Sequence, residues 1–400
     1  MLSHFQLALM LGMTVALGPL ALDAYLPAFP DMADGFSVPH ADIGLSLSAY
    51  VFTLGLAQLV GGPLSDRYGR KLILFGGLTV FAAAGLMIAQ SGTLGELVFW
   101  RVIQGIGGAF CAVSVPAIVR DQTSGQESAR LFGLIGLIMF IAPAAAPSLG
   151  AFTLSLGDWH WIFVVLAVYA VFLAFVLQTA LFPRLAPKPR ATTPVSTLVT
   201  NYGLVLRHSA TMRFVGIQVL CFSTMLLFIT HSSFIYQEWF GLSNSMFSVL
   251  FAANIVFMAA LNLINRPLLR RIPSVQLLRV QVIMQFVALL ALVTVVAMDG
   301  PFWAVVACMI AAIGCQGGIV PNNMANALEF FPHLGGTAAA LLGAAQFTLS
   351  GGISALSSAF GGDALLPIVV SMLACSTGAT LLVLGAPGAV ARERQAAAAA

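Results

Sequence analysis

Two charged side chains, Asp23 and Arg101, stand inside long apolar stretches of this sequence. Asp23 lies in GPLALDAYLPAFP between Pro19 and Pro27, which weaken a helix and free its backbone carbonyls. Ionisable residues inside apolar spans are costly and usually functional. Because burial penalises the charged form of a carboxyl, we expect Asp23 to exchange a proton near neutral pH and to alter the affinity of whatever binds beside it. The alternative is a carboxylate that only caps a helix end at the outer membrane interface.

Arg101 stands near the start of the apolar stretch LVFWRVIQGIGGAF. Gln104 and three glycines follow it and form a face of small residues suited to close helix packing. We interpret Arg101 as a cation that faces an interior cavity and polarises a water or a neighbouring span. It could instead extend outward as an interfacial anchor. The glycines do not complete GxGxxG and no strand precedes them, so a dinucleotide site is not expected.

A dense polar turn, SDRYGRK, follows Gly61, Gly62 and Pro63. A carboxylate here can lie at the N-terminus of another helix, where the helix dipole favours negative charge. Arg70 could bridge to Asp121 or to Glu127 and form a latch that is closed in one state and open in another. The alternative is that these cations only set membrane topology. The expected latch residues are Asp66, Arg67, Gly69, Arg70, Asp121 and Glu127.

Scattered polar and aromatic residues on several apolar stretches are candidates for lining a mostly apolar pocket. His231, in LLFITHSSFIYQEWF, is titratable, but a hydrogen-bonding role is the commoner one for an interior histidine. For the aromatic members, packing against lipid or neighbouring helices is the alternative. The candidate pocket residues are Tyr25, Tyr50, His231, Phe234, Tyr236, Asn254, Gln346 and Phe347, with Gln58 and Gln316 as further polar positions.

Membrane spans must position all of these residues. The chain has 400 residues, of which 60% are hydrophobic and 8% charged, whereas soluble domains carry about 25% charged residues. A helix crosses a bilayer core with about 20 apolar residues. The first span is expected to be retained, because Met1–Leu7 lacks the basic start of a cleaved signal. Twelve spans are predicted, at 5–26, 43–65, 72–90, 95–118, 131–155, 160–182, 213–236, 245–268, 275–298, 301–324, 336–360 and 364–386.

The basic residues predict how the spans are oriented. If both termini are cytoplasmic, every Lys and Arg except Arg101 falls on the cytoplasmic side. The charged side chains on the opposite side are then all acidic. The net charge of +3 follows from this topology and does not suggest nucleic-acid binding. The longest non-apolar connection then separates an N-terminal six-helix bundle (1–182) from a C-terminal one (213–400), with a cytoplasmic linker at 183–212.

The two halves of the chain echo one another. GGPLSDRYGRK follows the second span, and INRPLLRRIP follows the eighth, six spans later. Weak symmetry of this kind is typical of transporters whose site lies near the membrane midplane between repeats. The predicted fold class is therefore an all-α membrane protein of twelve transmembrane helices in two pseudo-symmetric six-helix bundles.

Several catalytic and energy-coupling motifs are absent from the sequence. There is no Walker A motif, no HExxH, no GxSxG and no TVGYG-like channel filter. The five cysteines show no metal-binding spacing. We therefore expect no enzyme activity, no cofactor and no metal, and a transport process driven by an ion gradient or by the gradient of the substrate.

Together these motifs resemble the major facilitator superfamily. GGPLSDRYGRK is similar to its signature loop between spans 2 and 3, and RVIQGIGGAF to the span-4 motif of proton-coupled members. APAAAPSLG resembles the span-5 motif of antiporters but lacks the usual Gly-Pro pair. LDAYLPAFP, VPAIVRDQ, WHWIF and PNNMANALEFFPHLGGTAAALLGAAQF are similar to the bicyclomycin/chloramphenicol-resistance branch of twelve-span drug:proton antiporters.

The resemblance implies a multi-pass protein of the bacterial inner membrane that exports neutral or zwitterionic antibacterials, such as amphenicol- or bicyclomycin-like drugs. It implies that Asp23 is the proton-coupling carboxylate, assisted by Arg101. Some relatives have a second acid earlier in span 1; LGMTVALG has none, so one proton site is expected. The expected partners are the drug, protons and lipid, and the expected state is a monomer. The alternatives are an exporter of an endogenous metabolite, such as an amino-acid derivative or a sugar, and an uncoupled receptor or channel.

Overall fold

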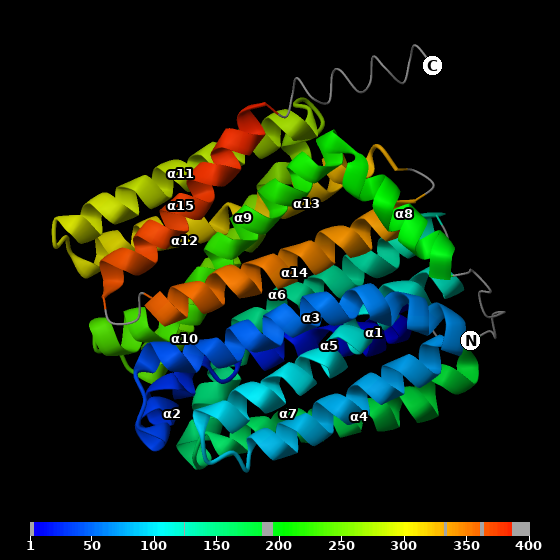
Figure 1. Ribbon diagram of the computed structural model, residues 1–400, viewed down its shortest axis with the longest axis horizontal. Coiled ribbons are helices and arrows are strands. Elements are labelled where there is room, and N and C mark those ends of the chain that lie inside the picture. Colours follow the sequence, from blue (N-terminus) through cyan, green and yellow to red (C-terminus); the bar gives the residue numbers. More distant parts are fainter. Residues whose placement is uncertain (1–3, 124, 186–194, 332–333, 361–363, 386–400) are drawn as a thin grey trace.

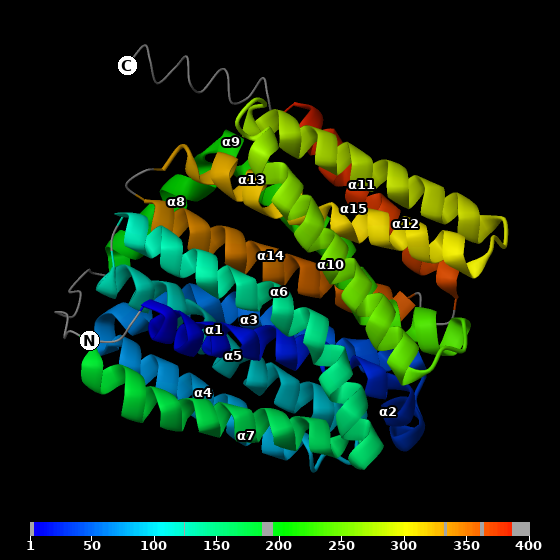
Figure 2. The ribbon, with the colours of Figure 1, turned by 180° about the vertical axis from the view of Figure 1, so that it is seen from behind.

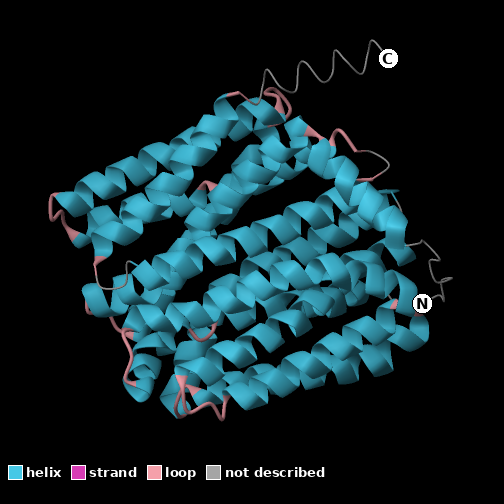
Figure 3. Cartoon of the chain, viewed as in Figure 1, coloured by secondary structure: helices cyan, strands magenta, loops and turns pink. Residues whose placement is uncertain are grey.

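The computed structural model describes residues 4–123, 125–185, 195–331, 334–360 and 364–385 of the chain. Residues 186–194 of the expected linker and the stretch 386–400 lie outside the described residues. Within the described residues all regular structure is helical (Figure 3). Among the described residues, twelve helical segments are long and apolar enough to cross a membrane, so the predicted number of spans is confirmed.

The helices lie where the apolar stretches predict them, and the differences are at their ends. In chain order the elements are α1 (His4–Asp23), η1 (Leu26–Ala28), α2 (Phe29–Phe36), α3 (His40–Tyr68), α4 (Arg70–Ile88), α5 (Leu94–Gln122), α6 (Gly125–Leu156), α7 (His160–Val176), η2 (Leu177–Leu181), η3 (Phe182–Arg184), α8 (Val195–Arg207), α9 (Ser209–Ser233), η4 (Phe234–Trp239), α10 (Asn244–Leu268), α11 (Ser274–Ala297), α12 (Phe302–Gly314), α13 (Gln316–Leu328), α14 (Gly335–Phe360) and α15 (Leu365–Leu384).

The first span is interrupted directly after Asp23. Pro27 has no N–H to donate to the carbonyl four residues earlier, and its ring would crowd that carbonyl, which belongs to Asp23. The chain therefore leaves α1 at Asp23, passes through η1 and resumes as α2. α2 runs to Phe36, beyond the predicted span of 5–26, and ends at Ser37, whose φ of 54° is left-handed.

The helices lie roughly side by side, with α1–α7 on one side of the molecule and α9–α15 on the other (Figures 1 and 2). Two pairs of helices join the sides: α3 packs along α14, and α6 packs along α10. We call the end of the molecule that holds α8 the linker end, and the opposite end, which holds α2, the α2 end (Figure 1). That the linker end is cytoplasmic stays a prediction from the basic residues.

The predicted linker contains a helix. α8 (Val195–Arg207) packs against α9 and α14, and α9 already begins at Ser209, inside the predicted 183–212 range. The sequence reading missed α8 because its polar residues broke the apolar pattern expected of a span. The boundaries of the two bundles stay a prediction.

Candidate functional site

Asp23 faces the protein interior. Its side chain is only 4% exposed, although no lipid covers the structure, so neighbouring protein atoms surround it. Its Oδ1 has no hydrogen-bond partner among the described residues. A carboxylate that only capped a helix at the outer interface would be exposed, which Asp23 is not. Its role in proton coupling stays a prediction.

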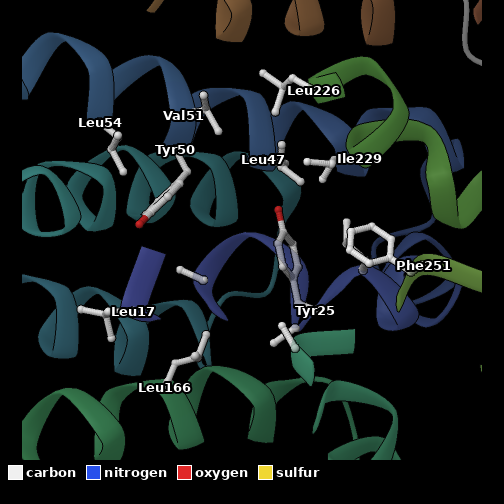
Figure 4. Packing of buried hydrophobic residues seen from close by; sticks show 14 of the residues in the cluster. Leu17, Tyr25, Leu47, Tyr50, Val51, Leu54, Leu166, Leu226, Ile229 and Phe251 are labelled. Carbon is white, nitrogen blue, oxygen red and sulfur yellow. The ribbon is translucent and has the colours of Figure 1, made fainter. Parts of the chain in front are cut away.

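Arg101 is fully buried between two aromatic rings. Its guanidinium carbon lies 4.6 Å from the ring centre of Tyr25 and 4.4 Å from that of Tyr50. Figure 4 shows Tyr50 extending from α3 and Tyr25 rising toward α3 from the chain after α1. A cation over a ring face is attracted by the ring quadrupole. The alternative of an outward-reaching interfacial anchor is therefore wrong for Arg101.

Two hydrogen bonds complete the surroundings of this guanidinium. Nη1 donates to Oε1 of Gln104 at 2.7 Å, and Nη2 donates to the carbonyl of Ala21 at 3.0 Å. Among the described residues, no ion pair within 4 Å joins Arg101 to Asp23. The buried cation is thus stabilised by ring faces and neutral acceptors.

Several polar atoms of Asp23, of Arg101 and of two side chains beside Arg101 are buried without a partner in the described part of the chain. They are Nε of Arg101, Nε2 of Gln104, the hydroxyl of Tyr50 and Oδ1 of Asp23. Buried polar groups are normally hydrogen-bonded, so several unpaired ones indicate a place for water or for a polar ligand. This cluster at the break after α1 is the candidate functional site.

Tyr25 is held from three directions. Its hydroxyl lies 3.0 Å from Oγ of Ser46 on α3, and its ring packs on Phe29 at 5.1 Å and on Phe163 at 5.4 Å between ring centres. Ser46 and Phe163 were missed as site residues. The pattern LSLSAY, which places small polar residues before Tyr50 in an apolar span, could have indicated Ser46.

The expected pocket residues of the second half fall into separate groups. Tyr236 is fully buried and packs on Phe228 and Phe247 with ring centres 6.3 and 6.2 Å away. Asn254 is also fully buried and donates to the carbonyl of Leu250 at 2.8 Å. Both belong to the second half of the chain and are distant from Arg101 in sequence. Their role in binding stays a prediction.

Gln346 and Phe347 lie on α14. Gln346 accepts a hydrogen bond from Nε2 of Gln218 at 2.7 Å, and the ring of Phe347 lies edge-on to Phe222 at 5.3 Å. Gln346 therefore has a partner within the second half in this state.

His231 and Phe234 lie at the α2 end. His231 is bonded to Oγ of Ser357 at 3.1 Å, which agrees with the hydrogen-bonding interpretation. The Phe234 ring lies 6.1 Å from that of His40, the first residue of α3. Phe234 therefore makes a contact between the two halves and does not line a pocket here.

Polar contacts close the two halves against each other at the α2 end. Nδ1 of His40 lies 2.9 Å from Oε2 of Glu238, and Nε2 of Gln237 donates to the carbonyl of Pro27 at 3.2 Å. Further along α3 and α14, Oγ of Ser48 donates to Oγ of Ser354 at 2.9 Å. The state described is therefore one in which this end is shut.

The turn between α3 and α4 gathers four of the expected latch residues. Nε of Arg70 donates to Oδ2 of Asp121 at 2.9 Å, and its Nη1 contacts Asp66. Gly69 has a φ of 99°, a backbone conformation that favours glycine. It makes the sharp turn that directs Arg70 back toward α3. Arg70 thereby ties together the ends of α3, α4 and α5. That this cluster works as a latch stays a prediction.

Arg67 and Glu127 lie outside this cluster. The Arg67 guanidinium lies 5.7 Å from the ring centre of its neighbour Tyr68. Glu127 lies 3.4 Å from His4, with both side chains exposed. The alternative of an Arg70–Glu127 bridge is thus not the arrangement found, because Asp121 at the end of α5 reaches Arg70 directly.

Comparison with known proteins decides the family. Residues 9–355 match the model of the family described as Major Facilitator Superfamily. The chain belongs to the Major Facilitator Superfamily. It is 27% identical over 93% of its length to the bicyclomycin resistance protein homolog of Haemophilus influenzae, of which it covers 94%. It is also 27% identical to a chloramphenicol resistance protein of Pseudomonas aeruginosa, over 85% of this chain and 80% of that protein.

The fold agrees with this family. The structure superposes on the crystal structure of a D-xylose–proton symporter with a TM-score of 0.76, covering 96% of both chains at 14% identity. At that identity only the fold is shared. The resemblance seen in the sequence is confirmed, as is the prediction that this major facilitator protein is a transporter and not an enzyme.

A buried amide network in the second half of this transporter was not predicted. Asn265 of α10 and Asn322 of α13 exchange hydrogen bonds of 3.1 and 2.9 Å. Gln281 of α11 donates to Asn265 at 3.1 Å and accepts from Asn322 at 3.0 Å. The network joins the eighth, ninth and tenth spans, as Arg70 joins the second, third and fourth. The signal was PNNMANAL, which places three asparagines in an apolar span.

Replacing Asn322 by leucine is expected to destabilise the transporter. The change removes Asn322 as a partner of the buried Asn265 amide and of the half-buried Gln281 amide, at a cost of about 1–3 kcal/mol. The measurement is the midpoint of thermal unfolding in detergent, which should fall by several degrees. Thr294→Val is the control, since Thr294 is exposed and bonds only within its own helix. Equal midpoints for both variants would contradict the structural role of the network.

Replacing Gly55 by alanine is expected to slow transport. A Cβ at Gly55 would meet the backbone N of Thr348 and lie 2.8 Å from the carbonyl O of Ala344, so α3 and α14 pack backbone to backbone here. Overpacking costs about 1–3 kcal/mol, which disfavours this closed state about 5- to 150-fold. The transport rate in vesicles should fall accordingly.

Gly62→Ala is the matched control on the same helix, because nothing lies within 4 Å of a Cβ at Gly62. It should transport like wild type. If the two variants transport equally well, close approach of α3 and α14 is not needed for the cycle.

Proposed function

We propose that this protein is a proton-coupled efflux transporter that exports small, largely neutral or zwitterionic antibacterial compounds, such as amphenicol- or bicyclomycin-like drugs, by alternating access. The observation that supports it best is the buried Asp23 at the break after α1. An ionisable residue inside a membrane span is costly to keep and marks a transport or proton pathway. The printed names of the relatives support the drug class.

The proposed cycle uses one carboxyl group for proton and substrate in turn. Deprotonated Asp23 faces a cavity open to the cytoplasm, where substrate binds. The halves then rock, a proton from outside binds Asp23, and substrate leaves. Proton and substrate must compete, because coupling requires that each lowers the affinity for the other. With the linker end taken as cytoplasmic, the structure corresponds to the state closed to the outside.

The experiment uses the purified protein in lipid vesicles that contain a pH-sensitive dye. Addition of an amphenicol or of bicyclomycin should cause proton movement that protein-free vesicles lack. If labelled drug crosses the membrane without any proton movement, coupling is contradicted.

The second candidate, an exporter of an endogenous metabolite, shares the same fold and site. It predicts that an amino-acid derivative or a sugar, and not the antibiotics, moves protons in these vesicles. A competition series with both classes of compound decides between the two. We further propose that the protein resides as a monomer in the bacterial inner membrane with both termini in the cytoplasm.

A further inference from the structure

Four aromatic side chains of the second half form a closed ring of contacts. They are Phe228 of α9, Tyr236 of η4, and Phe247 and Phe251 of α10, and all four are buried. The ring centre of Tyr236 lies 6.3 Å from that of Phe228 and 6.2 Å from that of Phe247. Phe251 completes the set, at 5.8 Å from Phe228 and 5.9 Å from Phe247. At these separations aromatic rings attract one another. We call these four residues the aromatic box.

Asn254 brings a carboxamide to the aromatic box. It follows Phe247 and Phe251 in steps of four and three residues, a spacing that places all three on one face of α10. The Asn254 side chain is fully buried and lies against the phenol of Tyr236, but the geometry between them does not make a hydrogen bond. Its Nδ2 donates to the carbonyl of Leu250, which leaves Oδ1 as the free atom of this amide.

Two polar atoms of this group have no hydrogen-bond partner among the described residues. They are the hydroxyl of Tyr236 and Oδ1 of Asn254. Leaving a buried polar atom unpaired is costly, and phenylalanine and leucine at these positions would fill similar space without that cost. The cost is recovered when a ligand accepts a hydrogen bond from the hydroxyl and donates one to Oδ1. The two atoms therefore indicate a binding site within an apolar wall.

The backbone at Tyr236 supports the same interpretation. Tyr236 lies on η4 (Phe234–Trp239), which is a π-helical turn, and such turns occur mostly at functional sites. Both α9 and α10 contact η1, the short helix that follows the break at Asp23. Figure 4 shows Phe251 in the same part of the packed interior as Tyr25, which directly precedes η1. The aromatic box thus belongs to helices that touch the candidate functional site from the second half.

We propose that the aromatic box is a subsite for a neutral aryl group of the substrate. The inference rests on the proposed function and names the part of the substrate that the second half recognises. In the closed state the four rings pack on one another, and when the halves move a substrate ring takes the place of one of these contacts. The Tyr236 hydroxyl then donates to a carbonyl, hydroxyl or nitro oxygen of the substrate, and Oδ1 of Asn254 accepts from a hydroxyl or an amide N–H.

The charges near the aromatic box favour a neutral ligand over a cation. Ring faces also attract cations, but a cation buried here would need an anion beside it. Glu238 is the only acid between Ser209 and Leu268 in the sequence. It is 53% exposed and its Oε2 lies 2.9 Å from Nδ1 of His40, so it is directed toward the contact between the halves. An amphenicol carries a neutral aryl ring beside hydroxyl and amide groups, whereas bicyclomycin has no aromatic ring.

The test compares Phe251→Leu with wild type in the vesicle assay, using chloramphenicol and bicyclomycin as the two probes. The quantity measured is the ratio of the two drug concentrations that give half-maximal proton movement. Loss of one ring should raise the ratio of chloramphenicol to bicyclomycin about fivefold to tenfold. Phe302→Leu is the matched control, because it removes a ring from another aromatic pair of the second half, with Phe240. It should keep the wild-type ratio. An unchanged ratio in Phe251→Leu, or an equal change in both variants, overturns the proposal.

Tyr236→Phe keeps the test decisive if Phe251→Leu does not insert. It preserves the ring and removes only a hydroxyl that has no partner in the described part of the chain. In detergent without drug its thermal unfolding midpoint should equal that of wild type. The chloramphenicol concentration that gives half of the drug-induced rise in midpoint should increase about fivefold. A lower midpoint without drug together with an unchanged response to chloramphenicol would mean that the hydroxyl holds a structural water, and this overturns the proposal.

Two further outcomes separate the aromatic box from the proposed function. Tetraethylammonium should not raise the unfolding midpoint, and a rise that Phe251→Leu removes would identify a cation site instead, which overturns the assignment to neutral rings. If wild-type vesicles respond to neither drug, the proposed function fails, and the comparison of Tyr236→Phe with wild type in detergent decides the subsite by itself. If wild type responds to both drugs and Phe251→Leu keeps their ratio, only the aromatic box fails.

Discussion

Replacing Asp23 by asparagine is expected to abolish substrate-dependent proton movement in vesicles while the protein still inserts into the membrane. Asparagine has nearly the same shape as a protonated aspartic acid, so the packing around this 4% exposed side chain is kept. It cannot ionise, so no proton is exchanged at this position. We expect a loss of about a hundredfold or more, as follows when a single group performs proton transfer.

Asp31→Asn is the matched control for this variant. Asp31 belongs to the same span, on α2, but is exposed. It should keep full proton movement at unchanged expression. Proton-coupled export that persists in Asp23→Asn would show that another group exchanges the proton, and the proposed function would then have to be abandoned.

Replacing Arg70 by alanine is expected to reduce the export rate about tenfold and to lower stability. The change leaves Asp66 and Asp121 facing each other without the cation that joins α3, α4 and α5. Removing one partner of a fully buried ion pair costs about 3–5 kcal/mol. Arg70 and Asp121 are 23% and 17% exposed, so solvent screening reduces the cost, to about 1–3 kcal/mol. The measurements are the export rate and the thermal unfolding midpoint.

Arg266→Ala tests whether the cluster, and not positive charge at the linker end, is responsible. Arg266 lies in the last turn of α10, which corresponds six spans later to the end of α3, and its side chain is exposed. It should export at the wild-type rate. If Arg70→Ala and Arg266→Ala lose activity equally, the result favours the alternative that these cations only set membrane topology.

The membrane architecture of this protein could be predicted from its amino-acid sequence alone. Span number and position follow from the length of apolar stretches, because a bilayer of fixed thickness requires about 20 such residues whatever their neighbours are. The family follows from GGPLSDRYGRK and RVIQGIGGAF, whose residues are close together in the chain. Asp23 and Arg101 stood out for the same local reason, since each is a charge in an apolar stretch.

The side chains that these residues contact could not be predicted and depend on the tertiary structure. Arg101 lies against Tyr25 and Tyr50, which are 76 and 51 positions away in the chain, and no spacing rule predicts that. The amide network between Asn265, Gln281 and Asn322 and the choice of Asp121 over Glu127 also depend on how helices cross. The physical reason is that apolar periodicity places a helix in the membrane, whereas its rotation and its partners are set by close packing between helices distant in sequence.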